Sequence, residues 1–156
     1  MWSVEFLIQM VAALIGTAAF AVMFRLNPRH LPWAIVGGGM TFLVYELVNG
    51  SLDSVFASAF LSSAVSAVYS EFCARWKRAP AAIFTLLCAI PIVPGGSLYR
   101  TMFCLISKDF SATGVYLGET VAIAIGMAGG LAAVSLLVHL IHGIAVYFQK
   151  KRKKIE

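Results

Sequence analysis

The sequence predicts an all-α integral membrane protein with about five transmembrane helices, the fourth of which is broken. Of its 156 residues, 60% are hydrophobic and 12% are charged, whereas soluble domains carry about 25% charged residues. The apolar segments are long and do not alternate with polar residues, which favours helices over a membrane barrel. One apolar stretch contains the segment PIVPGG, which a continuous helix does not accommodate. We expect residues 1–149 to form a single transmembrane domain.

The first two predicted spans cover residues 4–24 and 33–48. Residues 4–24 supply the roughly twenty apolar residues that a span needs, and the chain start has no basic region of a signal peptide, so we expect this span to be retained. The second span is short and rich in glycine. It ends at Asn49-Gly50-Ser51, which is a turn signal.

The third predicted span, residues 54–72, carries a serine at every fourth position. The serines are Ser54, Ser58, Ser62, Ser66 and Ser70. This serine ridge is typical of helices that pack closely, because small residues let two backbones approach. A hydrophilic path along the ridge is the alternative interpretation.

The fourth predicted span covers residues 81–106 and is broken at 91–96, where two prolines remove backbone donors and two glycines tolerate irregular torsions. The fifth covers residues 117–148, which is longer than one bilayer needs, so we expect it to tilt or to protrude. Within it, Gly126 and Gly130 form a GxxxG packing motif.

The basic residues predict the orientation. Five spans place ten of the twelve Lys and Arg residues on one side, and Arg100 and Lys108 on or toward the other. By the positive-inside rule, the N-terminus lies outside and the basic tail, residues 150–156, lies in the cytoplasm. The net charge of +5 does not indicate a nucleic-acid partner, because the run Lys150–Lys154 fits a juxtamembrane anchor on membrane lipid.

Irregular backbone at membrane depth survives only where protein or water surrounds it, so the break is the leading candidate for a substrate site. The helix that restarts near Ser97 directs the positive end of its dipole at the break, where it could receive a carboxylate. Arg100, one turn further, could add a charge-assisted contact. The alternative is a proline kink needed for packing, with Arg100 extending to the outer interface. The substrate-site candidates are Pro91, Pro94, Gly95, Gly96, Tyr99 and Arg100.

Two carboxylates in the spans, Glu46 and Glu119, are candidates for ion or proton coupling, because a carboxylate within a bilayer costs about 2.5–3.5 kcal/mol unless something compensates it. They could bind or relay a proton, or form ion pairs with Arg100. The alternative is that both lie near the outer interface and are solvated.

The sequence does not predict an enzyme, a cofactor or a metal site. It contains no nucleophile elbow, phosphate-cradling loop or HExxH motif. His139 and His142 lie three residues apart on the last span without a nearby carboxylate or thiol, so interfacial packing is the simpler interpretation.

The string AIPIVPGGSLYRTM, residues 89–102, resembles the signature of the threonine/serine exporter family. The early GTAAFAVMF, residues 16–24, the basic turn Asn-Pro-Arg after it and the glycine-rich second span also look like the small, separately encoded subunit of that family's split transporters, similar to the small subunit of a succinate exporter. The resemblance covers essentially the whole chain. Its core pattern, PxxPGGxxYxxM, spans Pro91 to Met102.

The resemblance implies a second multi-span membrane subunit as partner and export of small carboxylates across the plasma membrane. Threonine and serine, or a dicarboxylate such as succinate, are the implied substrates. We therefore expect a subunit of a secondary exporter, since the chain has no nucleotide-binding motif. The alternative is a non-transporting scaffold that holds a partner, or a second copy, through the serine ridge and Gly126/Gly130.

Overall fold

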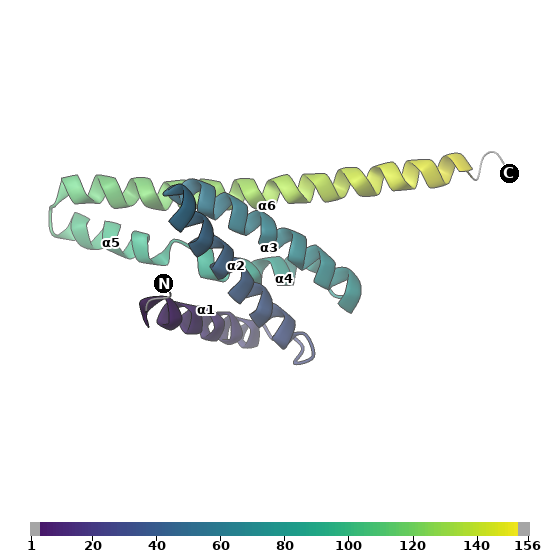
Figure 1. Cartoon of the computed structure of the whole chain (residues 1–156), viewed down its shortest axis with the longest axis horizontal. Helices are drawn as coiled ribbons and strands as arrows, with labels where there is room; N and C mark the ends of the chain where they lie inside the picture. Colours follow the sequence, from purple (N-terminus) through teal and green to yellow (C-terminus); the bar gives the residue numbers. More distant parts are fainter. Residues whose placement is uncertain (1–3, 153–156) are drawn as a thin grey trace.

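The computed structural model describes the backbone of residues 4–152 and the side chains of residues 4–141. All regular structure in these residues is helical (Figure 1). The elements are α1 (Val4–Met23), α2 (Leu31–Leu52), α3 (Val55–Lys77), α4 (Ala81–Ala89), the 3-10 helix η1 (Ile90–Ile92), α5 (Gly95–Ile106) and α6 (Phe110–Arg152).

Four helices in the described part of the chain are long and apolar enough to cross a membrane: α1, α2, α3 and residues 110–141 of α6. The pair formed by Ala81–Ile92 and Gly95–Ile106 passes the same test together and is bent by 50° at its break. If this pair is one broken span, the total is five. The predicted fold class, all-helical with about five spans and one broken, is therefore confirmed.

Two helices extend beyond the predicted spans at their C-terminal ends. The segment Asn49-Gly50-Ser51 is helical and not a turn, and the Ser51 hydroxyl donates to the Leu47 carbonyl at 2.8 Å within the helix. The chain turns instead at Asp53, whose φ of 47° is left-handed. Likewise α3 continues to Lys77 and ends at Arg78, with a φ of 52°. Both helices end at a left-handed residue that is not glycine, so the glycine signal was misleading.

The last helix begins at Phe110, seven residues before the predicted start of the fifth span. Asp109 precedes it, and the Asp109 carboxylate accepts a hydrogen bond from the Ala112 amide at 3.1 Å. Aspartate is a favourable N-cap, and hydropathy alone missed this start. At 43 residues, α6 is about 65 Å long. It therefore exceeds a bilayer of about 40–45 Å including headgroups.

Helix α3 lies at the centre of the bundle and packs against α2, α4 and α6. The GxxxG motif of α6 packs on it: a Cβ added to Gly126 would lie 2.7 Å from the Phe56 carbonyl oxygen, and one added to Gly130 would collide with Phe60 and Ser63. These glycines therefore permit close backbone contact within the chain.

The serine ridge is also buried inside the chain. Ser58, Ser62, Ser66 and Ser70 have no exposed surface, and three of their hydroxyls donate to the carbonyl four residues earlier, at 2.8, 2.6 and 2.7 Å for Ser58, Ser62 and Ser70. Glycines of α2 make similar contacts, because a Cβ on Gly37 would collide with Cys88 and lie 2.6 Å from the Tyr69 ring. Small residues thus fill the interior of the bundle.

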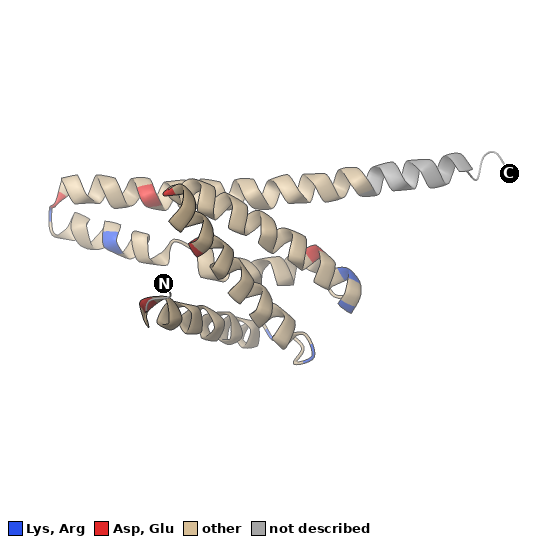
Figure 2. Cartoon of the chain, in the orientation of Figure 1, with Lys and Arg blue, Asp and Glu red and all other residues tan. Residues whose placement is uncertain are grey.

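Most of the described basic residues gather at one end of the bundle, and two others lie on α5 and in the α5–α6 turn (Figure 2). The α1–α2 turn, with Arg25 and Arg29, and the α3–α4 turn, with Arg78, meet there: Leu26, Leu31, Ala79 and Ala81 all pack on one apolar cluster that includes Phe84 and Leu87. The C-terminal part of α6 extends beyond this same end (Figure 1). The α2–α3 and α5–α6 turns, which carry Asp53 and Asp109, lie toward the opposite end.

Candidate substrate and coupling site at the broken helix

The two prolines of PIVPGG shape the break. Pro91 lies within η1, where the Val93 amide donates to the Ile90 carbonyl at 3.2 Å. Pro94 immediately precedes α5, and its carbonyl accepts from the Leu98 amide at 3.0 Å. No described side chain caps the start of α5. The positive end of this helix is therefore open to a ligand or to solvent.

A hydrogen bond joins the first turn of α5 to α6. The Ser97 hydroxyl donates to Oε1 of Glu119 at 2.9 Å. Both residues are half-buried. Ser97 was not among the residues that the sequence singled out as site candidates. One sequence feature could have indicated Ser97: it places a hydroxyl in the first turn after the break, and a neighbouring span carries a carboxylate.

Tyr45 of α2 lies at the same place. It packs against the apolar cluster of Ala59, Ile92 and Ile123, next to Glu46 in the same helix. Helices α2, α3 and α6 therefore converge on η1, with polar groups from three elements near the break. Tyr45 was not among the residues that the sequence singled out as site candidates.

The structure separates Arg100 from Tyr99. The Arg100 guanidinium lies 5.7 Å from the centre of the Tyr116 ring on α6, which is within the range of a cation–π contact. Tyr99 instead stacks along Phe103 at 6.4 Å and is 70% exposed. Within this chain, Arg100 faces the helix that carries Glu119, and Tyr99 faces away from it.

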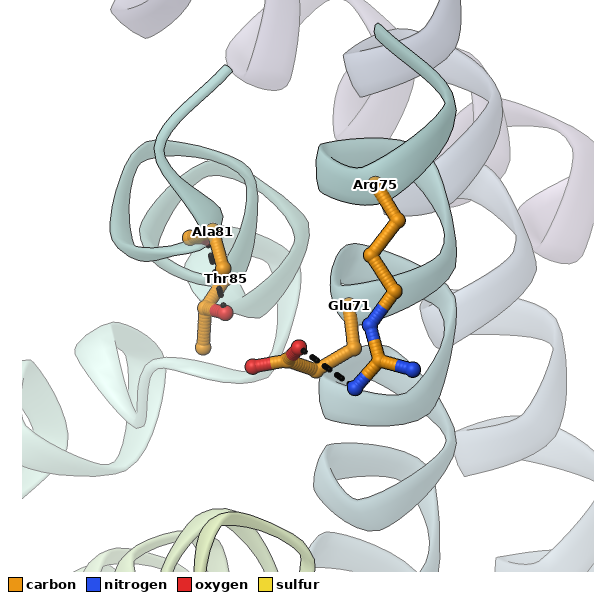
Figure 3. A network of polar contacts seen from close by, with 4 residues as sticks. All are labelled: Glu71, Arg75, Ala81 and Thr85. Carbon is orange, nitrogen blue, oxygen red and sulfur yellow. Dashed lines mark hydrogen bonds and ion pairs between the residues drawn. The ribbon is translucent and has the colours of Figure 1, made fainter. Parts of the chain in front are cut away.

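The ion pairs considered between Arg100 and the two glutamates are not formed by the described side chains. The ion pair found among them joins Arg75 and Glu71 at 3.7 Å, near the basic end (Figure 3). Glu119 is compensated by the Ser97 hydroxyl instead. Ser97 reaches Glu119 of α6, whereas Arg100, one turn further along α5, lies over Tyr116 of the same helix.

The two carboxylates lie inside their helices and not at the ends. Glu46 comes six residues before the end of α2, or about 9 Å along the axis, and Glu119 comes nine residues after the start of α6, or about 14 Å. A hydrocarbon core is about 30 Å thick. Neither carboxylate therefore lies in a turn that ends its helix.

The other side of the break is open. A Cβ on Gly95 or Gly96 would meet no atom within 4 Å. Further along α5, Leu98, Met102 and Phe103 are 51–60% exposed, and the helix packs chiefly on α6. The chain thus forms one wall of a site at the break, and nothing in the described residues covers the opposite side.

These features define a multi-span α-helical membrane protein with a discontinuous helix beside a carboxylate of another candidate span. Discontinuous helices form the binding sites of many secondary transporters. Residues 9–137 match the model of the family described as "Threonine/Serine exporter, ThrE", and the chain belongs to this family. No solved structure matches the chain. Membership of an exporter family favours a transporter over an enzyme.

Proposed function

We propose that this chain is one subunit of a secondary exporter that moves small carboxylates outward across the plasma membrane, together with a second multi-span subunit of the same family. Threonine and serine, or a dicarboxylate such as succinate, are the candidate substrates. The observation that carries the proposal is the Ser97–Glu119 hydrogen bond, which ties the restarted helix α5 to an intramembrane carboxylate on α6.

The substrate carboxylate would bind on the open side of the break. The Gly95 amide donates to the Val93 carbonyl at 2.7 Å, so the uncapped start of α5 presents the amides of Gly96 and Ser97. Such a helix end favours an anion by about 0.3–1 kcal/mol at exposed positions. Arg100, one turn further and over Tyr116 of α6, adds a full positive charge beside this end of the helix. The prolines Pro91 and Pro94 hold the backbone open, and the two glycines keep its approach free of side chains.

Glu119 would carry the coupling proton, with Glu46 as the second candidate. An ionised carboxylate accepts hydrogen bonds only, whereas a protonated one also donates. Protonation of Glu119 would therefore change the bond that the Ser97 hydroxyl now donates. Because that bond joins α5 to α6, the proton would alter how the broken helix is held, which is what coupling requires.

The open side of the site supports a partner subunit. The exposed apolar face of α5 and the uncovered Gly95 and Gly96 would be completed by the second subunit. A purely structural scaffold is less well supported, because the serine ridge and Gly126/Gly130, which it would use for docking, are occupied within the chain. The two basic turns at one end support a cytoplasmic C-terminus and an external N-terminus.

Efflux from loaded cells tests the proposal. Labelled threonine, serine and succinate are followed in cells that express this chain with and without the candidate second subunit. We expect export of at least one substrate only when both chains are present, and loss of that export in Ser97→Ala and Glu119→Gln. Ser107→Ala, which removes an exposed hydroxyl at the other end of α5, is the matched control. Undiminished export by Ser97→Ala would remove the α5–α6 bond from the mechanism.

A further inference from the structure

The outer face of α3 carries two adjoining grooves that the exporter site does not use. One groove, of about 460 Å³, is lined by Met40, Ala64, Val65, Val68, Tyr69 and Phe72. The other, of about 490 Å³, is lined by Phe72, Arg75 and Trp76. Both volumes fall in the range of about 300–1,000 Å³ that is usual for small-molecule sites. Phe72 lines both grooves, so the two grooves are contiguous along α3.

The two ends of this combined groove differ in chemistry. The part of the groove next to α2 is apolar, and its Val68 and Phe72 side chains are 59% and 61% exposed. At the other end of the groove, near the C-terminus of α3, the Arg75 side chain is 65% exposed. The Lys77 ammonium lies there too, 4.5 Å from the Trp33 ring and 4.7 Å from the Trp76 ring. The groove therefore joins a hydrocarbon surface to a cationic, aromatic rim.

The length of the groove matches one leaflet. From Ala64 to Trp76, α3 rises about 18 Å at 1.5 Å per residue, and half of a hydrocarbon core is about 15 Å. Tryptophan side chains are enriched at the membrane interface, and the Trp33–Trp76 pair, with ring centres 5.0 Å apart, lies at the basic end of the bundle. The apolar part would then lie at acyl-chain depth and the cationic rim at headgroup depth.

We propose that this groove is a binding site for one anionic phospholipid, with its acyl chain along Val65, Val68 and Phe72 and its phosphate at Arg75 and Lys77. Charge complementarity selects this occupant. Arg25, Arg29 and Arg78 lie in the turns at the same end, and Glu71 is the acidic side chain near the groove, where it is paired with Arg75 (Figure 3). A lipid without net negative charge would leave the positive charges at this end of the groove without a counter-charge.

Brominated lipids test the site, because bromine quenches tryptophan that it touches. The bromine is placed on the acyl carbons nearest the headgroup, so that it lies at the depth of Trp76. The full chain is reconstituted in phosphatidylcholine vesicles that contain brominated phosphatidylglycerol or brominated phosphatidylcholine. The signal of interest is the quenching lost in Trp76→Phe. We expect phosphatidylglycerol to be preferred at Trp76 by at least about fivefold, since one basic residue near the surface favours an anionic lipid by about that factor.

Charge variants make the test specific. Arg75→Gln should lower the preference by about fivefold, whereas Lys108→Gln, which removes a cation at the α5–α6 turn, should leave it unchanged. Glu71→Gln should raise the preference because it frees Arg75, and Glu5→Gln is its control. The proposal is overturned if both lipids quench Trp76 equally, or if Arg75→Gln behaves as Lys108→Gln does. It is also overturned if neither lipid quenches Trp76, because a second copy or a partner subunit then covers the groove.

Discussion

The α3–α6 interface and the start of α5 use glycine in opposite ways. In the interface, Gly126 and Gly130 lie so close to the α3 backbone that no side chain fits. At the break, Gly95 and Gly96 have open space where a side chain would lie. Packing within the chain explains the first pair and does not explain the second. The glycines at the break are better explained by something outside the chain, either a ligand or a partner.

Polar side chains show the same contrast. The serines of α3 are buried, and those with a hydrogen bond donate within their own helix, so they serve close packing. Ser97 donates to a carboxylate on a different helix. A hydroxyl bonded to its own backbone adds little to the link between helices, whereas the Ser97–Glu119 bond links α5 to α6.

The largest effect should come from filling the α3–α6 interface. Gly130→Leu would drive a side chain into Phe60 and Ser63, and overpacking typically costs about 1–3 kcal/mol and occasionally more. We expect the upper end or complete misfolding, because α3 backbone must move. Thermal unfolding of the purified chain, followed by circular dichroism, measures it. Gly114→Leu, in the same helix with nothing within 4 Å, is the control. Equal melting temperatures would contradict the tight interface.

Hydropathy and proline placement predicted the architecture well. The broken fourth helix falls where the two prolines and two glycines require it, because a missing amide donor acts locally and needs no tertiary information. The GxxxG and serine ridges also proved to be packing surfaces. The sequence does not reveal that both pack within one chain, since a small-residue ridge fits a neighbouring helix of the same chain or of another equally well.

The site was harder to predict than the fold. Ser97 reaches Glu119 because α5 packs on α6, and Tyr45 lies near the break because α2, α3 and α6 meet at η1. The helix-to-helix register that brings them there is a tertiary property. The ion pairs between Arg100 and the carboxylates, one of the alternatives that the sequence left open, are not formed by the described side chains for the same reason. One turn of α5 separates Ser97 from Arg100, and that turn places the guanidinium over Tyr116. The predicted positions of helix ends were wrong where an aspartate cap or a left-handed residue sets the end.

A smaller effect, on export and not on folding, should follow Arg100→Ala. A hydrogen bond to a charged group contributes about 1.5–3 kcal/mol, so we expect the apparent affinity for the exported carboxylate to fall by about 10- to 100-fold. Substrate-dependent efflux rates measure it, and Lys108→Ala controls for the loss of one positive charge. Assembly with the second subunit should persist. Unchanged efflux would exclude Arg100 from substrate binding.

Gly96→Leu tests the other half of the comparison directly. A Cβ added at Gly96 meets no atom within 4 Å in the chain. The substitution also removes glycine, which has a low helix propensity, so the purified chain should melt at the same temperature or slightly higher. Export should nevertheless fall, by about tenfold if the new side chain costs about 1.4 kcal/mol in the complex or at the substrate. Co-purification of the second subunit distinguishes the two causes. Full export by this variant would mean that nothing approaches the break at Gly96.

The smallest effect concerns how α5 is held. Asp109 caps α6 at the turn that joins it to α5, and loss of an aspartate cap costs about 1 kcal/mol. Because α5 packs chiefly on α6, Asp109→Ala should loosen this turn and the adjoining part of α5 without reaching the α3–α6 interface. Hydrogen exchange should therefore quicken at residues 110–113 and stay unchanged at 123–134. Asp109→Asn, which keeps a capping oxygen, should exchange like the unmodified chain. Equal acceleration in both segments would mean that the two regions unfold together, and that the open wall at the break is as firmly held as the packed core.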